Sequence, residues 1–225
     1  MPTQIEGQGG QILQVDASHR AARMSLRPLD HGALGHYSVA VVTGTIAASL
    51  TANSTLFSVR WGNASNLMVV EEVVVMAQHV VAAAAVAQFD LEMIIARTFT
   101  ASDTGGSAVA LTTNNAKRRT NMGTSLVTDM RIATTGTLTP GTRTLDSNSF
   151  GRIQGQMQTT IGGRIFDLQP FPIWRAVPGI YPLVLAQDEG FLIRNPIVAP
   201  ATATWVLMVG VRWAEVVSYG NAQLG

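Results

Sequence analysis

From Tyr37 onward the chain is a succession of short runs of β-branched and other apolar residues, separated by glycine, asparagine, aspartate and proline. Valine, isoleucine and aromatic side chains favour the pleated backbone, and the separating residues favour turns. Eight or more such strands predict an all-β fold, an antiparallel β-sandwich of the jelly-roll type. The expected strands lie at residues 37–42, 56–61, 67–75, 88–95, 109–111, 126–132, 137–145, 183–185, 191–193 and 204–213.

Two of these runs also predict which faces are buried. In 88–95, apolar residues alternate with Gln88, Asp90 and Glu92, which is typical of a strand buried on one face only. In 204–213, one face carries alternating large apolar residues and the other is also mostly apolar. We therefore expect 204–213 to be a central strand covered on both sides.

Residues 71–97 also fit a single long helix, because the run includes four consecutive alanines at 82–85. The valines and isoleucines at 73–75, 80, 81, 94 and 95 oppose this, and a helix with apolar residues all round would have to be buried on every side. Strands are the favoured interpretation, with the helix left as the alternative.

Residues 1–35 differ from the rest of the chain in composition. They are rich in glycine and hold most of the early charges, and apolar residues recur without sustained periodicity. Arg20, Arg23 and Arg27 recur at spacings of three and four, so residues 17–26 can form a short helix with one basic face. We expect an extended N-terminal arm at 1–35 and a β-sandwich domain at 36–225.

The middle and the later part of the chain contain two further kinds of segment. Residues 98–144 are dense in threonine, serine, asparagine and glycine, which can cover a water-facing surface without charge. Residues 152–163 alternate glutamine with apolar residues, as in a solvent-facing ribbon or long loop. Residues 166–182 combine four prolines with bulky apolar side chains, and proline does not fit a central strand. We expect a loop or edge strand with exposed aromatics there.

Charge is scarce in this chain. Only 13% of its 225 residues are charged, against about 25% in an average domain, while 47% are hydrophobic and the net charge is +1. The absence of cysteine excludes disulfide scaffolds, iron–sulfur clusters and thiolate chemistry. Near-zero net charge disfavours a dedicated nucleic-acid binder. Residues 73–89 are uncharged but shorter than the roughly 20 residues of a membrane span, so we interpret them as core.

The candidates for catalysis and metal binding are weak. His31 and His36 lie near Asp30 on a glycine-containing segment, without an evident third ligand, and His79 lies in an apolar run typical of a core or interface histidine whose ring nitrogens are satisfied. Asp90 and Glu92 share a strand face, as a retaining glycosidase would require, but a polar strand face is the favoured interpretation. No nucleophile elbow or phosphate loop is present. We predict no catalytic, cofactor-binding or metal-binding residue.

Two polar segments have ordinary structural interpretations. Residues 188–190, Asp-Glu-Gly, lie between two expected strands and predict a hairpin turn. Residues 117–119, Lys-Arg-Arg, are the only basic triplet, and no aromatics interleave with them to stack on bases. A solvated loop is expected there, or an arginine cluster that pairs with acids of a neighbouring subunit.

The composition favours assembly. Scarce charge, exposed aromatics and arginine as the dominant cation are typical of interfaces, and a free monomer rarely exposes large apolar patches. The predicted interface residues are Arg20, Arg23 and Arg27 of the arm together with Phe171, Trp174 and Tyr181 of the proline-rich segment.

Several segments resemble blocks that recur in virion proteins of tailed bacteriophages. They include LFSVRWGN at 56–63, TLTPGTRTLD at 137–146 and YPLVLAQDEGFLIRN at 181–195, with further blocks at 27–48, 97–134 and 200–216. These blocks contain no catalytic signature, so the resemblance implies a structural role. By fold analogy, it implies a non-enzymatic capsid decoration or cement protein.

The resemblance further implies a homo-oligomer, with a trimer favoured, that is assembled in the bacterial host cytoplasm and binds the major capsid protein or other virion proteins at the head. No membrane or direct nucleic-acid role is expected. A tail, neck or head-fibre component and a jelly-roll shell protein are the alternatives within the particle. A carbohydrate-binding module for host attachment, with Phe171, Trp174 and Tyr181 as a stacking platform, is the alternative from another class. A glycosidase using Asp90 and Glu92 is the least favoured.

Overall fold

The computed structural model describes residues 34–159, 170–177 and 181–219, and within them the regular elements are strands. The predicted arm, including Arg20, Arg23 and Arg27, lies outside the described residues except for its last two positions. The strands are β1 (Gly35–Val42), β2 (Ser54–Trp61), β3 (Leu67–Val81), β4 (Ala87–Arg97), β5 (Ser107–Ala108), β6 (Asp129–Ile132), β7 (Thr144–Leu145), β8 (Gly151–Met157), β9 (Phe171–Arg175), β10 (Leu183–Leu185), β11 (Glu189–Asn195) and β12 (Thr204–Val216). The described residues contain no helix long and apolar enough to cross a membrane.

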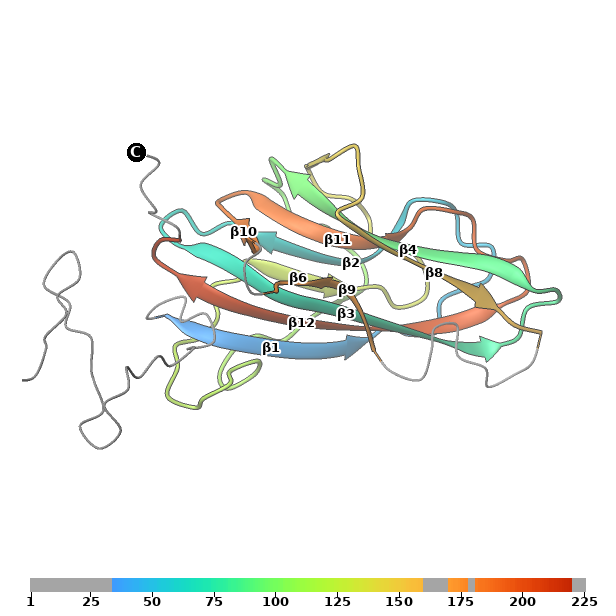
Figure 1. The fold of residues 1–225 in the computed structure, drawn as a ribbon, viewed down its shortest axis with the longest axis horizontal. Helices are drawn as coiled ribbons and strands as arrows, with labels where there is room; N and C mark the ends of the chain where they lie inside the picture. Colours follow the sequence, from blue (N-terminus) through green and yellow to red (C-terminus); the bar gives the residue numbers. More distant parts are fainter. Residues whose placement is uncertain (1–33, 160–169, 178–180, 220–225) are drawn as a thin grey trace, which may run out of the picture. The chain divides into compact units, whose positions relative to one another are not determined.

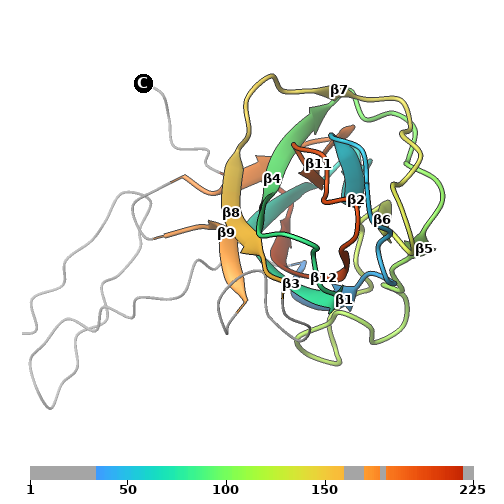
Figure 2. The ribbon, with the colours of Figure 1, turned by 90° about the vertical axis from the view of Figure 1, so that its right-hand side faces the viewer.

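The strands form two antiparallel sheets that pack face to face (Figures 1 and 2). One sheet has the order β1-β12-β3-β10, and β9 pairs with β3 beside β10. The other has the order β5-β6-β2-β11-β4-β7, and β8 also pairs with β4. The predicted all-β sandwich is therefore confirmed.

The order of the strands is that of a jelly roll. Along the chain, β1, β2, β3 and β4 alternate between the two sheets, and so do β8, β9 with β10, β11 and β12. The core sheets read β1-β12-β3-β10 and β2-β11-β4-β8 once β5, β6 and β7 are set aside as additions from the long β4–β8 connection. Apart from the β4–β8 connection, which joins neighbours in one sheet, the principal connections cross from one sheet to the other, and several of them lie at the same end.

The space between the sheets is filled by large side chains from both. Phe89 of β4 meets Trp205 of β12 edge-on, with ring centroids 4.6 Å apart, and both side chains are buried. Phe57 of β2 and Phe191 of β11 lie side by side with ring centroids 6.2 Å apart, and Trp61 of β2 is also fully buried. Each such ring removes about 150–250 Å² from water, so this contact between sheets is the main apolar core.

Residues 71–97 form most of β3, the connection after it and the whole of β4, rather than a helix. β3 and β4 cover this run, and the alanine segment at 82–86 is the turn region between them. The favoured interpretation of 71–97 is confirmed. Tertiary pairing decides it, since β3 is bonded along its length to β12 on one side and to β9 and β10 on the other.

The expected one-sided burial of 88–95 is wrong. Asp90 and Glu92 do lie on the face opposite Phe89, but they are 0% and 4% exposed. Side chains from neighbouring strands cover them: Arg152 of β8 binds Asp90, and Arg194 of β11 binds Glu92. Local alternation shows which face is polar but not what long side chains from other strands will cover.

The prediction of a central strand at 204–213 is confirmed in its position, because β12 pairs with both β1 and β3. Its inner residues are buried, but its outer face is only partly covered. Val206 and Met208 are half-buried and Arg212 is exposed.

Two smaller expectations are corrected. The short strand expected at 109–111 is β5 at Ser107–Ala108, and Val109 adds one hydrogen bond to Met130 beyond it. The turn before Glu189 is not a hairpin, because β10 and β11 belong to different sheets. Asp188 takes a φ of 58°, which aspartate tolerates, and the chain crosses from one sheet to the other there.

Within the proline-rich segment, β9 is an edge strand, which confirms one of the two expectations for it, and residues 166–169 and 178–180 lie outside the described residues. β9 pairs with β3 through a register shift between Val73 and Val74, opposite Trp174 and Pro172. Proline is tolerated here because, at a bulge on an edge strand, its missing backbone N–H does not remove a hydrogen bond from the sheet. The ribbon expected at 152–163 is β8 over Gly151–Met157, with Ile153 and Met157 buried, and residues 160–163 lie outside the described residues.

Candidate interaction surface

Three connections between strands lie together at one end of the sandwich. They are the β1–β2 connection (43–53), the β3–β4 connection (82–86) and the β11–β12 connection (196–203), and together with the adjoining strand ends we call them the loop end. The backbone N–H of Ala84 donates to the hydroxyl of Thr202 at 2.8 Å, and that of Ser49 donates to the carbonyl of Pro200 at 3.0 Å. This end lies at the right of Figure 1 and faces the viewer in Figure 2.

The loop end has no charged side chain in the parts that the structure describes. Residues 39–54, 73–89 and 195–211 contain no aspartate, glutamate, lysine or arginine. Five of the exposed large hydrophobic side chains lie there, namely Val42, Val80, Val81, Val86 and Val198, with exposed fractions between 43% and 62%. A surface of exposed valines and alanines without charge is typical of an interaction site rather than of free protein surface.

A buried polar pair lies beneath this surface. His79 of β3 and Trp205 of β12 are register partners, 3% and 0% exposed. Within the described residues, the two ring nitrogens of His79 and the indole N–H of Trp205 have no hydrogen-bond partner. Burial lowers the pKa of His79, because the charged imidazolium would be placed in an apolar environment. The expectation of a core histidine fits its burial, but its polar atoms are not satisfied.

Charge gathers at the opposite end of the sandwich. Arg60, near the end of β2, donates to Asp188 at 3.2 Å and to the carbonyl of Phe99 at 2.5 Å. Arg97, at the end of β4, pairs with Glu189 and Asp146. The two ends of this domain therefore offer different chemistry.

The predicted interface aromatics do not form one cluster. Trp174 is half-buried and packs against Phe150 of the β7–β8 connection, with ring centroids 4.7 Å apart. Tyr181 is 66% exposed and meets Tyr219 edge-on at 5.3 Å. Phe171 is 50% exposed on the edge strand β9.

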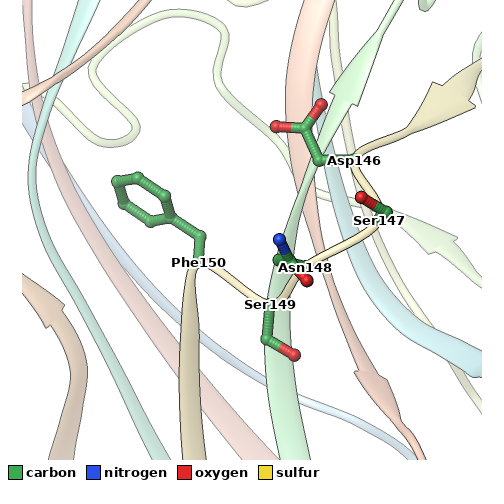
Figure 3. A pocket seen from close by; sticks show the side chains of 5 residues that line it. All are labelled: Asp146, Ser147, Asn148, Ser149 and Phe150. Atoms are coloured by element: carbon green, nitrogen blue, oxygen red, sulfur yellow. The ribbon is translucent and has the colours of Figure 1, made fainter.

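Phe150 lines a shallow hollow beside the edge of the β4 sheet. The hollow has a volume of about 340 Å³ and is formed by residues 146–150, Asp-Ser-Asn-Ser-Phe (Figure 3). Asp146 is bound to Arg97 at 3.4 Å, and Ser149 donates to Glu92. The hollow thus combines one aromatic ring with short polar side chains.

Asp90 and Glu92 each form an ion pair with an arginine of a neighbouring strand. Asp90 also accepts hydrogen bonds from Gln88 at 3.0 Å and from Gln154 at 3.3 Å. Glu92 accepts hydrogen bonds from Arg194 and Ser149. Carboxylates held on several sides by donors within the chain are typical of a structural network, here a buried one in place of the expected water-facing polar face.

His36 and Arg118 also have a partner within the chain. His36 Nδ1 lies 3.0 Å from Glu71, and Arg118 lies 4.0 Å from the same carboxylate. Lys117 forms a backbone bridge with Tyr37 beside the edge of β1. Asp30 and His31 lie outside the described residues. Among the residues that the structure does describe, no group of three potential metal ligands occurs.

Two buried charge sites escape sequence reasoning. Arg143 is paired with Asp103, with side-chain exposures of 5% and 0%. Glu215 accepts hydrogen bonds from Ser125, Leu126 and Trp213 at the other side of the domain. Both sites join residues far apart in sequence, so no local pattern indicates them.

The loop end does have a sequence signal. Residues 73–89 are interpreted above as core because they lack charge, and the structure places their centre, 80–86, at the surface. Similar charge-free stretches at 39–54 and 195–211 join it only through the fold. No known protein family, curated protein or solved structure matches this chain.

Proposed function

We propose that this chain is a non-enzymatic structural protein of a tailed-bacteriophage particle, and that it serves as a capsid cement or decoration subunit. The observation that carries the proposal is the loop end: a charge-free surface of exposed valines and alanines on a rigid sandwich. Such a surface binds other protein surfaces through apolar contact. The sequence blocks that resemble phage virion proteins support the same class.

The role in the particle follows from what a cement subunit needs. It needs a rigid fold, a surface for contact with its neighbours and little dependence on mobile lysines, and this chain has 14 arginines and one lysine. We propose the major capsid protein or another virion protein as the partner and the head as the location, with assembly as a homo-oligomer, a trimer being favoured. A tail, neck or head-fibre component and a jelly-roll shell protein remain the alternatives in the particle.

The test is the location of the chain in purified particles. Mass spectrometry of gradient-purified virions and an electron-microscopy map with a tagged chain should find the protein on the head shell. Heads that lack the chain should open at a lower temperature, and the purified protein should restore the original temperature. Absence of the chain from purified virions would overturn the proposal, and density at the neck or tail would select the alternative within the particle.

A second candidate is a carbohydrate-binding module for host attachment, and the hollow at 146–150 favours it. Aromatic rings stack on sugar faces, and Phe150 is 40% exposed there with Trp174 against it. Binding to a glycan array that Phe150→Ala abolishes and Phe171→Ala leaves unchanged would support this function. Absence of glycan binding by the wild-type chain would remove it.

A further inference from the structure

We propose that the loop end is a self-association surface, on which a second copy of this chain packs with its own loop end. The proposal does not depend on a role in the phage particle. It rests on the chemistry of the surface, on the contrast between the two ends of the domain and on the way in which the three connections are held.

The chemistry of the loop end selects an uncharged partner. Its described residues offer methyl groups of valine and alanine, with threonine, serine and asparagine between them. A charged partner surface would lose its hydration there without gaining an opposite charge, which is costly. A partner of matching chemistry carries exposed small apolar side chains and neutral hydrogen-bonding groups.

The same end of another copy has that chemistry, and the opposite end does not. Arg60, Arg97 and Asp188 lie at the opposite end in ion pairs that are partly exposed. Stacking one copy's loop end on another's charged end would bury those groups against valine. Packing like end against like end avoids this cost and gives a closed arrangement about a symmetry axis instead of an open fibre.

The loop end is also ordered enough to act as a surface. Hydrogen bonds tie the β11–β12 connection to both others: Ala84 N–H to Thr202, Ser49 N–H to Pro200, and Ala199 N–H to Leu50 at 2.9 Å. Because the connections are fixed to one another, a partner does not have to order them on binding, and less conformational entropy is lost.

The test substitutes single valines at the loop end and measures association. We choose Val86→Lys and Val198→Lys, which lie on different connections and are 56% and 62% exposed. The matched control is Val217→Lys, because Val217 is 65% exposed but follows β12 at the opposite end. Sedimentation velocity across a dilution series gives the association constant of each protein, and circular dichroism with thermal unfolding checks its fold.

We expect the wild-type chain to form a discrete oligomer. Both loop-end variants should associate about a hundredfold more weakly, since each buries an unpaired ammonium group in the contact, while Val217→Lys should match the wild type. Hydrogen exchange of the unsubstituted chain gives a second readout: amides at 80–86 and 196–203 should gain protection as concentration rises. A monomeric wild type, or equal weakening by all three substitutions, would overturn the proposal.

The outcomes separate this proposal from the proposed function. A wild-type monomer whose binding to phage heads is lost in Val86→Lys and Val198→Lys would assign the loop end to a virion protein instead of to a second copy. An oligomer that the same substitutions dissociate, from a chain absent from purified particles, would keep the self-association surface and remove the virion role.

Discussion

Glu215 is almost fully buried, and its carboxylate accepts hydrogen bonds from two side chains and one backbone N–H. Ser125, the backbone N–H of Leu126 and the indole of Trp213 bind it, and so it attaches the long β4–β8 connection to β12. Burial raises the pKa of Glu215 despite these donors, and burial with the nearby Glu215 charge raises the pKa of Tyr37 to about 12. The ionised carboxylate therefore forms these hydrogen bonds while losing its hydration, and this desolvation lowers the stability of the folded state.

This cost predicts a pH dependence for Glu215→Gln. A carboxyl group with a raised pKa in the folded state gives full stability below its ordinary pKa and loses it as pH rises through the raised value. Glutamine carries no charge, so this loss should disappear. We expect the melting temperature of the variant to gain on that of the wild type as pH rises from about 4 to 7. A constant difference across that range would contradict the account.

His79 predicts the opposite pH dependence. Its pKa is lowered by burial, so the unfolded chain binds a proton more readily than the folded one. The stability that the neutral ring permits is present above about pH 6.5 and is lost as pH falls. His79→Leu removes the titrating group, so the wild type should lose melting temperature relative to the variant below that pH. Parallel melting curves of the two proteins in acid would show that His79 gains a proton without cost.

At the level of elements, a buried ion pair joins two parts of the long β4–β8 connection, and its arginine also bonds to β2. Arg143 binds Asp103 and donates to the hydroxyl of Thr55 at 3.0 Å, and its guanidinium lies 5.4 Å from the centre of the Phe99 ring. Asp103 also accepts a hydrogen bond from the backbone N–H of Gly141 at 2.8 Å. Burial and the nearby Arg194 lower the pKa of Arg143 to about 10.

Removal of one member of this pair should be strongly destabilising. Arg143→Met leaves Asp103 buried without its cation, and we expect a loss of about 3 kcal/mol in the free energy of unfolding. Urea denaturation measures it. The double variant Arg143→Met, Asp103→Asn should lose less than the sum of the single variants, since it leaves no unpaired charge. Additive losses would mean that the two side chains do not act as a pair.

The strands were predictable from sequence because their pattern is local. Valine at 73–75 and the alternation at 89–95 suffice to indicate strands, and the prolines at 170 and 172 suffice to exclude a central strand, which leaves a loop or an edge. What lies opposite each strand is not local. The cover of Asp90 comes from Arg152, more than sixty residues away, and the turn at Asp188 joins two sheets because of the order of all the strands.

At the scale of the domain, the topology separates charge from apolar surface. Connections that lie far apart in sequence meet at the loop end, and each of the three described ones is uncharged. Over the residues that the structure describes, the scarcity of charge is thus not spread evenly. The uncharged surface is concentrated at the loop end, and no single segment of the sequence reveals this. The aromatics expected to form the interface lie instead at separate sites, on β9 and on the connection that follows it.

This separation predicts how association depends on salt. Contacts between charged groups weaken as salt screens them, whereas apolar contacts persist and strengthen in salts that are excluded from protein surfaces. If the copies meet through their loop ends, the association constant should not fall when sodium chloride is raised from low ionic strength to about 1 M, and it should rise in sodium sulfate. Sedimentation velocity of the wild-type chain at each salt concentration measures this. A steep fall in sodium chloride would instead assign the contact to charged residues, among which the predicted interface arginines, Arg20, Arg23 and Arg27, would be the first to replace.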